Sequence, residues 1–187
     1  MYGVLLSMSL GASAAADQAS GPYIAARQAA LAHDYKPASD YFARALAQSP
    51  RDSVIVSQTM TAFLASGDVK KAHALARLLM AGEGSYPLAE VLVLSEHFKR
   101  NDYQAALDHL DSTTVVGRAI DELLKGWALV GLGQMAEALR LFDAVVPVEG
   151  MRSFALYQKG LAQTLAGDFE GAAASFSRQG QAAPALN

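Results

Sequence analysis

Gly67-Asp68-Val69-Lys70-Lys71-Ala72 contains one of five copies of a turn that recurs along the chain. The five turns are His33-Asp34-Tyr35, Gly67-Asp68-Val69, Asn101-Asp102-Tyr103, Gly133-Gln134-Met135 and Gly167-Asp168-Phe169. An alanine follows each turn three residues later, at intervals of 34, 34, 32 and 34 residues: Ala38, Ala72, Ala106, Ala138 and Ala172. A fixed period of this length is typical of a solenoid of helical hairpins. Five hairpins exceed the number, about three, that such an array needs for stability.

Apolar residues recur every three or four positions on both sides of each turn, which predicts a pair of helices per copy. The first pair is expected to start near Pro22, because proline suits the opening turn of a helix. The aspartates of four turns are expected to cap the second helices by accepting backbone N–H bonds: Asp34, Asp68, Asp102 and Asp168. The run Ser112-Thr113-Thr114 interrupts the pattern in the copy that is two residues short.

Residues 19–184 resemble the tetratricopeptide repeat family. The resemblance rests on the second-helix alanines and on a large residue four positions later, at Phe42, Leu110, Phe142 and Phe176. Pro50 and Pro184 match the terminating proline of the family, and Gly126 and Gly160 match its small first-helix residue. Met60, Leu94 and Ala76 depart from the pattern, and the usual first-helix tryptophan is absent from every copy. The resemblance implies an all-α, right-handed α-solenoid of about five hairpins, with repeats near 19–52, 53–86, 87–118, 119–152 and 153–186.

The first 16 residues, MYGVLLSMSLGASAAA, run from apolar to small residues. Ala12-Ser13-Ala14 and Ala14-Ala15-Ala16 match the cleavage pattern of a secretory signal, although no Lys or Arg precedes the apolar stretch. We therefore expect export to a bacterial periplasm, with residues 17–21 as a polar lead and the array at 22–184. The alternatives are a cytoplasmic protein and a short apolar helix that packs on the first repeat. The segment is too short to span a bilayer, which takes about 20 apolar residues.

Composition excludes several classes of function. The chain is 52% hydrophobic and 18% charged, which argues against disorder. A formal net charge of -3 and the lack of a Lys/Arg run argue against nucleic acid as a partner. Cysteine is absent, so disulfides and thiolate metal sites are excluded.

No pattern of catalytic or ligand-binding residues is evident. His33, His73, His97 and His109 lack the spacing of a metal site. Gly131-Leu132-Gly133 lacks the third glycine of a dinucleotide loop, and there is no nucleophile-elbow motif. We expect a non-enzymatic protein without cofactor or metal.

The family resemblance implies that first helices line a concave groove. Alignment by the turns places Ser57, Thr61 and Ser95 there, together with a set that is apolar and aromatic toward the C-terminal half: Tyr23, Arg27, Val91, Phe98, Leu123, Trp127, Val130, Tyr157 and Leu161. An apolar strip of this kind predicts a scaffold or adaptor that binds an apolar peptide or amphipathic helix of a partner protein. The alternative for Trp127 is burial by packing between repeats or by the N-terminal segment.

The fifth hairpin ends at Gln179-Gly180, and Phe169 and Phe176 are expected to leave an apolar face uncovered, since arrays generally need a polar capping helix. The alternative function is therefore a self-associating array, or the N-terminal part of a longer solenoid, with no separate client. A third alternative is a subunit that docks a catalytic domain.

Overall fold

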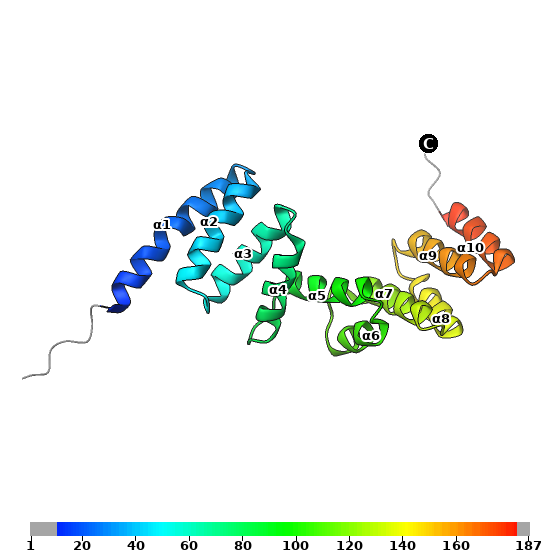
Figure 1. Ribbon diagram of the computed structural model, residues 1–187. Helices are drawn as coiled ribbons and strands as arrows, with labels where there is room; N and C mark the ends of the chain where they lie inside the picture. The colour runs from blue at the N-terminus through cyan, green and yellow to red at the C-terminus, as the bar shows by residue number, and fades with distance from the viewer. Residues whose placement is uncertain (1–10, 183–187) are drawn as a thin grey trace, which may run out of the picture. The chain divides into compact units, whose positions relative to one another are not determined.

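The computed structural model describes residues 11–182. Within them every regular element is an α-helix, and consecutive helices pair as hairpins (Figure 1). The bounds are α1 Gly11–Leu31, α2 Tyr35–Gln48, α3 Ser53–Ala65, α4 Val69–Met80, α5 Pro87–Lys99, α6 Tyr103–Ser112, α7 Arg118–Gly131, α8 Met135–Val145, α9 Arg152–Leu165 and α10 Phe169–Ala182. The all-α repeat architecture expected from the sequence is confirmed.

The helices divide into two compact units, and the division falls inside α5, between Val93 and Leu94. In unit 1, α1 to α4 pack in sequence order, and one core cluster is built around Val56, Met60 and Leu79. In unit 2, α6 to α10 pack in the same order, and the largest cluster is built around Leu123 and Phe142.

The five turns share one backbone geometry. The residue before the Asp or Gln has a positive φ in every copy: 58° at His33, 84° at Gly67, 58° at Asn101, 75° at Gly133 and 78° at Gly167. The backbone N–H of the following residue then donates a hydrogen bond to the carbonyl five residues earlier, in the first helix. Asp68 donates to Phe63 at 2.8 Å in this way, and Asp168 donates to Gln163 at 2.9 Å. This is the Schellman termination, which satisfies carbonyls that the helix end leaves open.

The two turns without glycine share a compensating contact. A positive φ is costly for residues with a Cβ. The side chains of His33 and Asn101 are each held by the hydroxyl of a tyrosine two residues later. His33 Nδ1 lies 2.9 Å from the Tyr35 hydroxyl, and Asn101 Oδ1 accepts a bond of 2.8 Å from the Tyr103 hydroxyl. Where glycine is present, the matching residue is Val69, Met135 or Phe169, none of which carries a hydroxyl.

The predicted capping role is confirmed for three of the four aspartates. The carboxylates of Asp68, Asp102 and Asp168 accept from the N–H three residues later, at 3.4, 3.4 and 2.9 Å. The prediction is wrong for Asp34, whose side chain makes no cap bond. The residue three positions after it is Pro37, which has no N–H to donate.

In hairpins four and five a large side chain of the second helix packs over a glycine of the first helix. The five repeat alanines are buried, and Phe142 packs over Gly126 as Phe176 packs over Gly160. A Cβ on either glycine would lie within 2.6 Å of the ring.

Met60 and Ala76, which depart from the family pattern, occupy this same pair of positions in the second hairpin, and both are buried. In this hairpin the first helix supplies the large residue, Met60, and the second helix supplies the small one, Ala76. Together they still fill the space between the two helices.

Neighbouring hairpins of unit 2 are joined by a repeated ion pair. Lys125 Nζ of α7 lies 2.6 Å from Asp111 Oδ1, and Lys159 Nζ of α9 lies 2.7 Å from Asp143 Oδ2 of α8. Both lysines are mostly buried on the side chain. They occupy the same repeat position, as do both aspartates. Such a pair fixes how one hairpin sits on the previous one.

The first helix begins earlier than expected. The sequence predicts a start near Pro22, but α1 begins at Gly11 and contains Pro22 in its interior. The preceding residues are rich in alanine, the strongest helix former, so the helix extends through the expected lead 17–21. Of the signal-like segment 1–16, residues 1–10 lie outside the described part of the chain, as does Pro184.

Candidate functional site

The residues expected to line a groove in unit 2 do not form one accessible strip. Leu123 is 3% exposed and belongs to the core with Phe142, Ala155 and Ala162. Its assignment to an open groove is therefore wrong. The reason is that its repeat position faces the next hairpin, whose helix α9 contributes both alanines to the same cluster.

Trp127 is half-buried and fixed between two hairpins. Its Nε1 donates a 3.0 Å bond to Gln158 Oε1 of α9, and its ring meets Phe142 edge-on with centroids 5.8 Å apart. Both the apolar body and the polar tip of the side chain have partners inside the protein. These contacts fit the alternative that the sequence allows for Trp127, which is packing between repeats.

The remaining residues of the expected strip differ in environment. Val130 packs against the core around Leu123, and Phe98 meets the Tyr103 ring at 6.2 Å. Leu161 is half-buried, while Val91 and Tyr157 are exposed. Tyr157 also contacts Phe176, with ring centroids 5.9 Å apart.

The N-terminal part of the expected strip lies beside a pocket of about 310 Å³ in unit 1. Arg27 and Thr61, both predicted groove residues, line the pocket from α1 and α3. Tyr23 is half-buried next to it, edge-on against Phe42 at 6.0 Å. The other lining residues are mostly apolar and come from α1, α2 and α3: Ala30, Leu31, Tyr35, Ala38, Phe42, Gln58, Ala62 and Ala65.

Gln58 is the unusual member of the lining. Its Oε1 atom is buried, and no described group donates a hydrogen bond to it. A buried acceptor without a donor costs free energy, so it favours an occupant that brings an N–H. Thr61, in contrast, donates to the Ser57 carbonyl at 3.0 Å. Sequence alignment missed Gln58 because only burial distinguishes it from other polar first-helix residues.

Arg27 supplies the positive charge at this pocket. Its side chain is exposed, and no carboxylate among the described side chains forms an ion pair with it. The pocket thus combines mostly apolar walls with one buried acceptor that has no donor and one cation.

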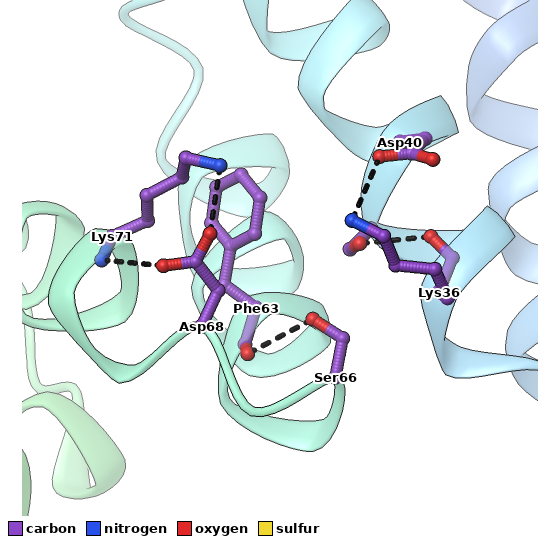
Figure 2. Close-up of polar contacts among 7 residues, drawn as sticks. Lys36, Asp40, Phe63, Ser66, Asp68 and Lys71 are labelled. Atoms are coloured by element: carbon purple, nitrogen blue, oxygen red, sulfur yellow. Dashed lines mark hydrogen bonds and ion pairs between the residues drawn. The ribbon is translucent and has the colours of Figure 1, made fainter.

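A second polar cluster lies at the α3–α4 turn, drawn in Figure 2. Lys71 Nζ lies 2.7 Å from Asp68 Oδ2 and 5.0 Å from the centre of the Phe63 ring. The hydrogen bond from the Lys71 side chain lowers the pKa of Asp68 below its ordinary value. These groups satisfy one another and stabilise the turn, so the cluster has a structural role.

Among residues 11–182 no group of His, Asp and Glu side chains is arranged to hold a metal ion. In the same range no helix has the length and apolarity that crossing a membrane requires.

Comparison with known proteins found relatives at the level of structure. No protein-family model matches the chain, and no curated protein matches it. The MamA structure covering residue 41 to the end, from Desulfovibrio magneticus RS-1, superposes with a TM-score of 0.70 at 17% identity, over 88% of this chain and 94% of that one. Another MamA crystal structure gives 0.70 at 15% identity, over 92% and 99%.

YrrB, described as a TPR protein with an unusual peptide-binding site, gives a TM-score of 0.69 at 15% identity, over 95% of this chain and 94% of that one. At these identities the likeness shows the fold. Five repeated hairpins with shared turns, buried alanines and these structural relatives show that the chain has the tetratricopeptide repeat fold.

Proposed function

We propose that this chain is a non-enzymatic scaffold that binds an apolar segment of another protein, with the α1–α3 pocket holding the anchoring side chain. The single observation that carries the proposal is the pocket itself, which has apolar walls and a buried acceptor without a donor at Gln58. YrrB, a protein of the same fold, is described as having a peptide-binding site, which supports a peptide as the class of ligand.

The pocket favours a definite kind of occupant. Its volume of about 310 Å³ suits one large apolar side chain rather than a whole helix. The Gln58 Oε1 atom needs an N–H donor, which any peptide backbone supplies. Arg27 can bind a carbonyl or carboxylate of the same segment. The ligand is therefore a short peptide with an aromatic or large aliphatic anchor.

Selection from a phage-displayed library of random peptides tests this proposal. The bait is the full chain, and each enriched peptide is then measured by calorimetry against two variants. Ala65→Trp places an indole at the pocket from an exposed position at the end of α3. Ala74→Trp makes the same change at an exposed site of α4 outside the pocket.

We expect enriched peptides to share a large apolar residue, and Ala65→Trp to weaken their binding by about tenfold or more while Ala74→Trp leaves it unchanged. Peptides that bind both variants equally well would contradict the pocket as the site. Failure to enrich any peptide would contradict the function.

We further propose that residues 1–16 direct export to a bacterial periplasm. The small-residue cleavage pattern supports this. Residues 1–21 fused to alkaline phosphatase lacking its own signal should give active enzyme in a bacterial host, because that enzyme folds only after export. A charge introduced by Leu5→Lys should abolish the activity. An inactive parent fusion would favour the cytoplasmic alternative.

A further inference from the structure

We propose that copies of this chain associate head to tail, with the exposed face of hairpin five in one copy receiving α1 of a second copy as the next helix of the array. The tail face consists of Tyr157, Leu161, Phe169, Ala173, Phe176 and Ser177, and the head face of Gly21, Ile24, Ala25 and Gln28. The inference concerns different side chains from those of the pocket and does not depend on the proposed peptide binding.

The tail face repeats a surface that is covered one hairpin earlier. The first helices α7 and α9 end at Gly131 and Leu165, and the second helices α8 and α10 begin at Met135 and Phe169, so positions correspond at intervals of 34 residues. Leu123 is 3% exposed where hairpin five packs on hairpin four, whereas its counterpart Tyr157 is 45% exposed. Met135 is half-buried there, whereas its counterpart Phe169 is 70% exposed. The tail face has the chemistry of an internal interface, and no described residue covers it.

The head face corresponds to the surface by which α9 packs on hairpin four. The helices α1 and α9 share a register in which Leu31 corresponds to Leu165, and Ile24 therefore corresponds to Gln158. Ile24 is 65% exposed in the middle of α1, although isoleucine is among the residues most often buried.

A hydrogen-bonded pair of the interface between hairpins four and five has apolar counterparts on both the tail face and the head face. In the interface between hairpins four and five, Trp127 donates to Gln158. Leu161 stands at the Trp127 position of the tail face, and Ile24 at the Gln158 position of the head face. Both counterparts are apolar, so association of the two faces would bury neither an unpaired donor nor an unpaired acceptor at this position.

The ion pair of the same interface also has uncharged counterparts on the two faces. Asp143 of α8 and Lys159 of α9 lie 2.7 Å apart in the internal interface. Ser177 occupies the aspartate position of the tail face, and Ala25 the lysine position of the head face. Burying either charge alone would be costly, and both are absent.

Side-chain volumes on the two faces also differ from those of the internal interface in opposite directions. Gln28 is larger than Ala162, its counterpart in α9, while Ala173 is smaller than Leu139, its counterpart in α8. Both counterparts belong to the cluster between hairpins four and five. These matched replacements identify a second copy of this chain as the occupant, since an unrelated helix has no reason to match them.

Light scattering coupled to size exclusion tests the proposal on the full chain. One variant, Ile24→Asp, blocks the head face, and another, Phe169→Asp, blocks the tail face. Both sites are exposed, so the monomer should fold. Val54→Asp is the control, because Val54 is 56% exposed on α3 and belongs to neither face.

The wild type and Val54→Asp should show a mass that rises with concentration. Each blocked variant should associate about tenfold or more weakly, because its carboxylate would be buried without a partner. An equimolar mixture of the two blocked variants should form dimers and nothing larger, since it contains one intact head face and one intact tail face.

A wild type that stays monomeric up to its solubility limit would overturn the proposal. So would a mixture of the blocked variants that stays monomeric, or a Val54→Asp variant that associates as weakly as they do. Self-association lost with Phe169→Asp but unchanged with Ile24→Asp would indicate a tail-to-tail contact and would also overturn it.

An introduced ion pair gives a second test. The single changes Ala25→Lys and Ser177→Asp should each weaken association, because each adds one unpaired charge. The double variant should recover it, since the introduced lysine of one copy would then face the introduced aspartate of the next. Independent effects of the two changes would contradict the register of the two faces.

Discussion

The exchange of Met60 and Ala76 shows how a hairpin of this chain tolerates variation in single residues. The space between the two helices is filled by a ring over glycine in hairpin four, Phe142 over Gly126, and by a large first-helix residue with alanine opposite in hairpin two. In these two hairpins one large and one small residue share the space, although the helix that supplies the large residue differs.

The change Gly126→Ala tests this packing. Its Cβ would lie 2.6 Å from the fully buried Phe142 ring, so the ring or the backbone would have to shift. We expect a loss of about 1–3 kcal/mol in the free energy of unfolding, measured by urea denaturation. Gly180→Ala is the control, because a Cβ at this position would project into open space. The double variant Gly126→Ala, Phe142→Leu should be more stable than Gly126→Ala alone, and a double variant of equal or lower stability would contradict the steric explanation.

The ion pair at the α3–α4 turn makes a prediction about pH. The Lys71 side chain lowers the pKa of Asp68, so ionised Asp68 favours the folded state. This contribution is present above the ordinary carboxyl pKa of 3.8 and is lost as the pH falls through the lowered value. In an NMR titration of the carboxyl carbon, Lys71→Gln should raise the pKa of Asp68 toward its ordinary value. An unchanged titration would show that Lys71 is not the cause.

At the scale of the helix, the capping aspartates provide an internal comparison. Asp168 accepts from the Gly171 N–H at 2.9 Å, whereas Asp34 faces Pro37 and caps nothing. Asp168→Ala should lower the protection of α10 amides from hydrogen exchange by about 1 kcal/mol, and Asp34→Ala should leave α2 nearly unchanged. Equal effects at the two sites would mean that the cap bond is not what stabilises these helices.

The connection between α6 and α7 depends on one buried carboxylate. Asp121 is 5% exposed and accepts N–H bonds from Val115, Val116 and Gly117 at 3.0, 3.0 and 3.4 Å. We expect Asp121→Asn to cost about 1–3 kcal/mol in thermal unfolding, because an amide NH2 cannot accept from the backbone. Glu122→Gln, one residue along α7, is the matched control. A stability loss as large in the control would contradict this explanation.

At the scale of the molecule, the period of the turns was enough to predict the fold. Helix pairs, buried alanines and most caps follow from local sequence, because each hairpin repeats the same contacts with its neighbour. The Asp121 loop could not be predicted, since it lies where the repeat is interrupted and its partners are backbone groups.

The candidate site was less accessible to sequence analysis. Alignment by the turns assigned Arg27, Thr61 and Leu123 alike to the groove, but Arg27 and Thr61 line the α1–α3 pocket whereas Leu123 is buried in the core. The position of a residue in the repeat predicts which face of its helix the side chain lies on, but it does not predict whether the next hairpin covers that face. The same position is core in Leu123 and exposed in Tyr157.

The most direct test of the peptide-binding pocket is an NMR titration of the labelled full chain with a peptide selected on it. We predict amide shift changes concentrated around Gln58, Ala62 and Ala65, with the indole N–H of Trp127, the one tryptophan of the sequence, unchanged. Changes concentrated around Trp127 and Tyr157, with those pocket amides unmoved, would contradict the assignment of the binding site to the α1–α3 pocket.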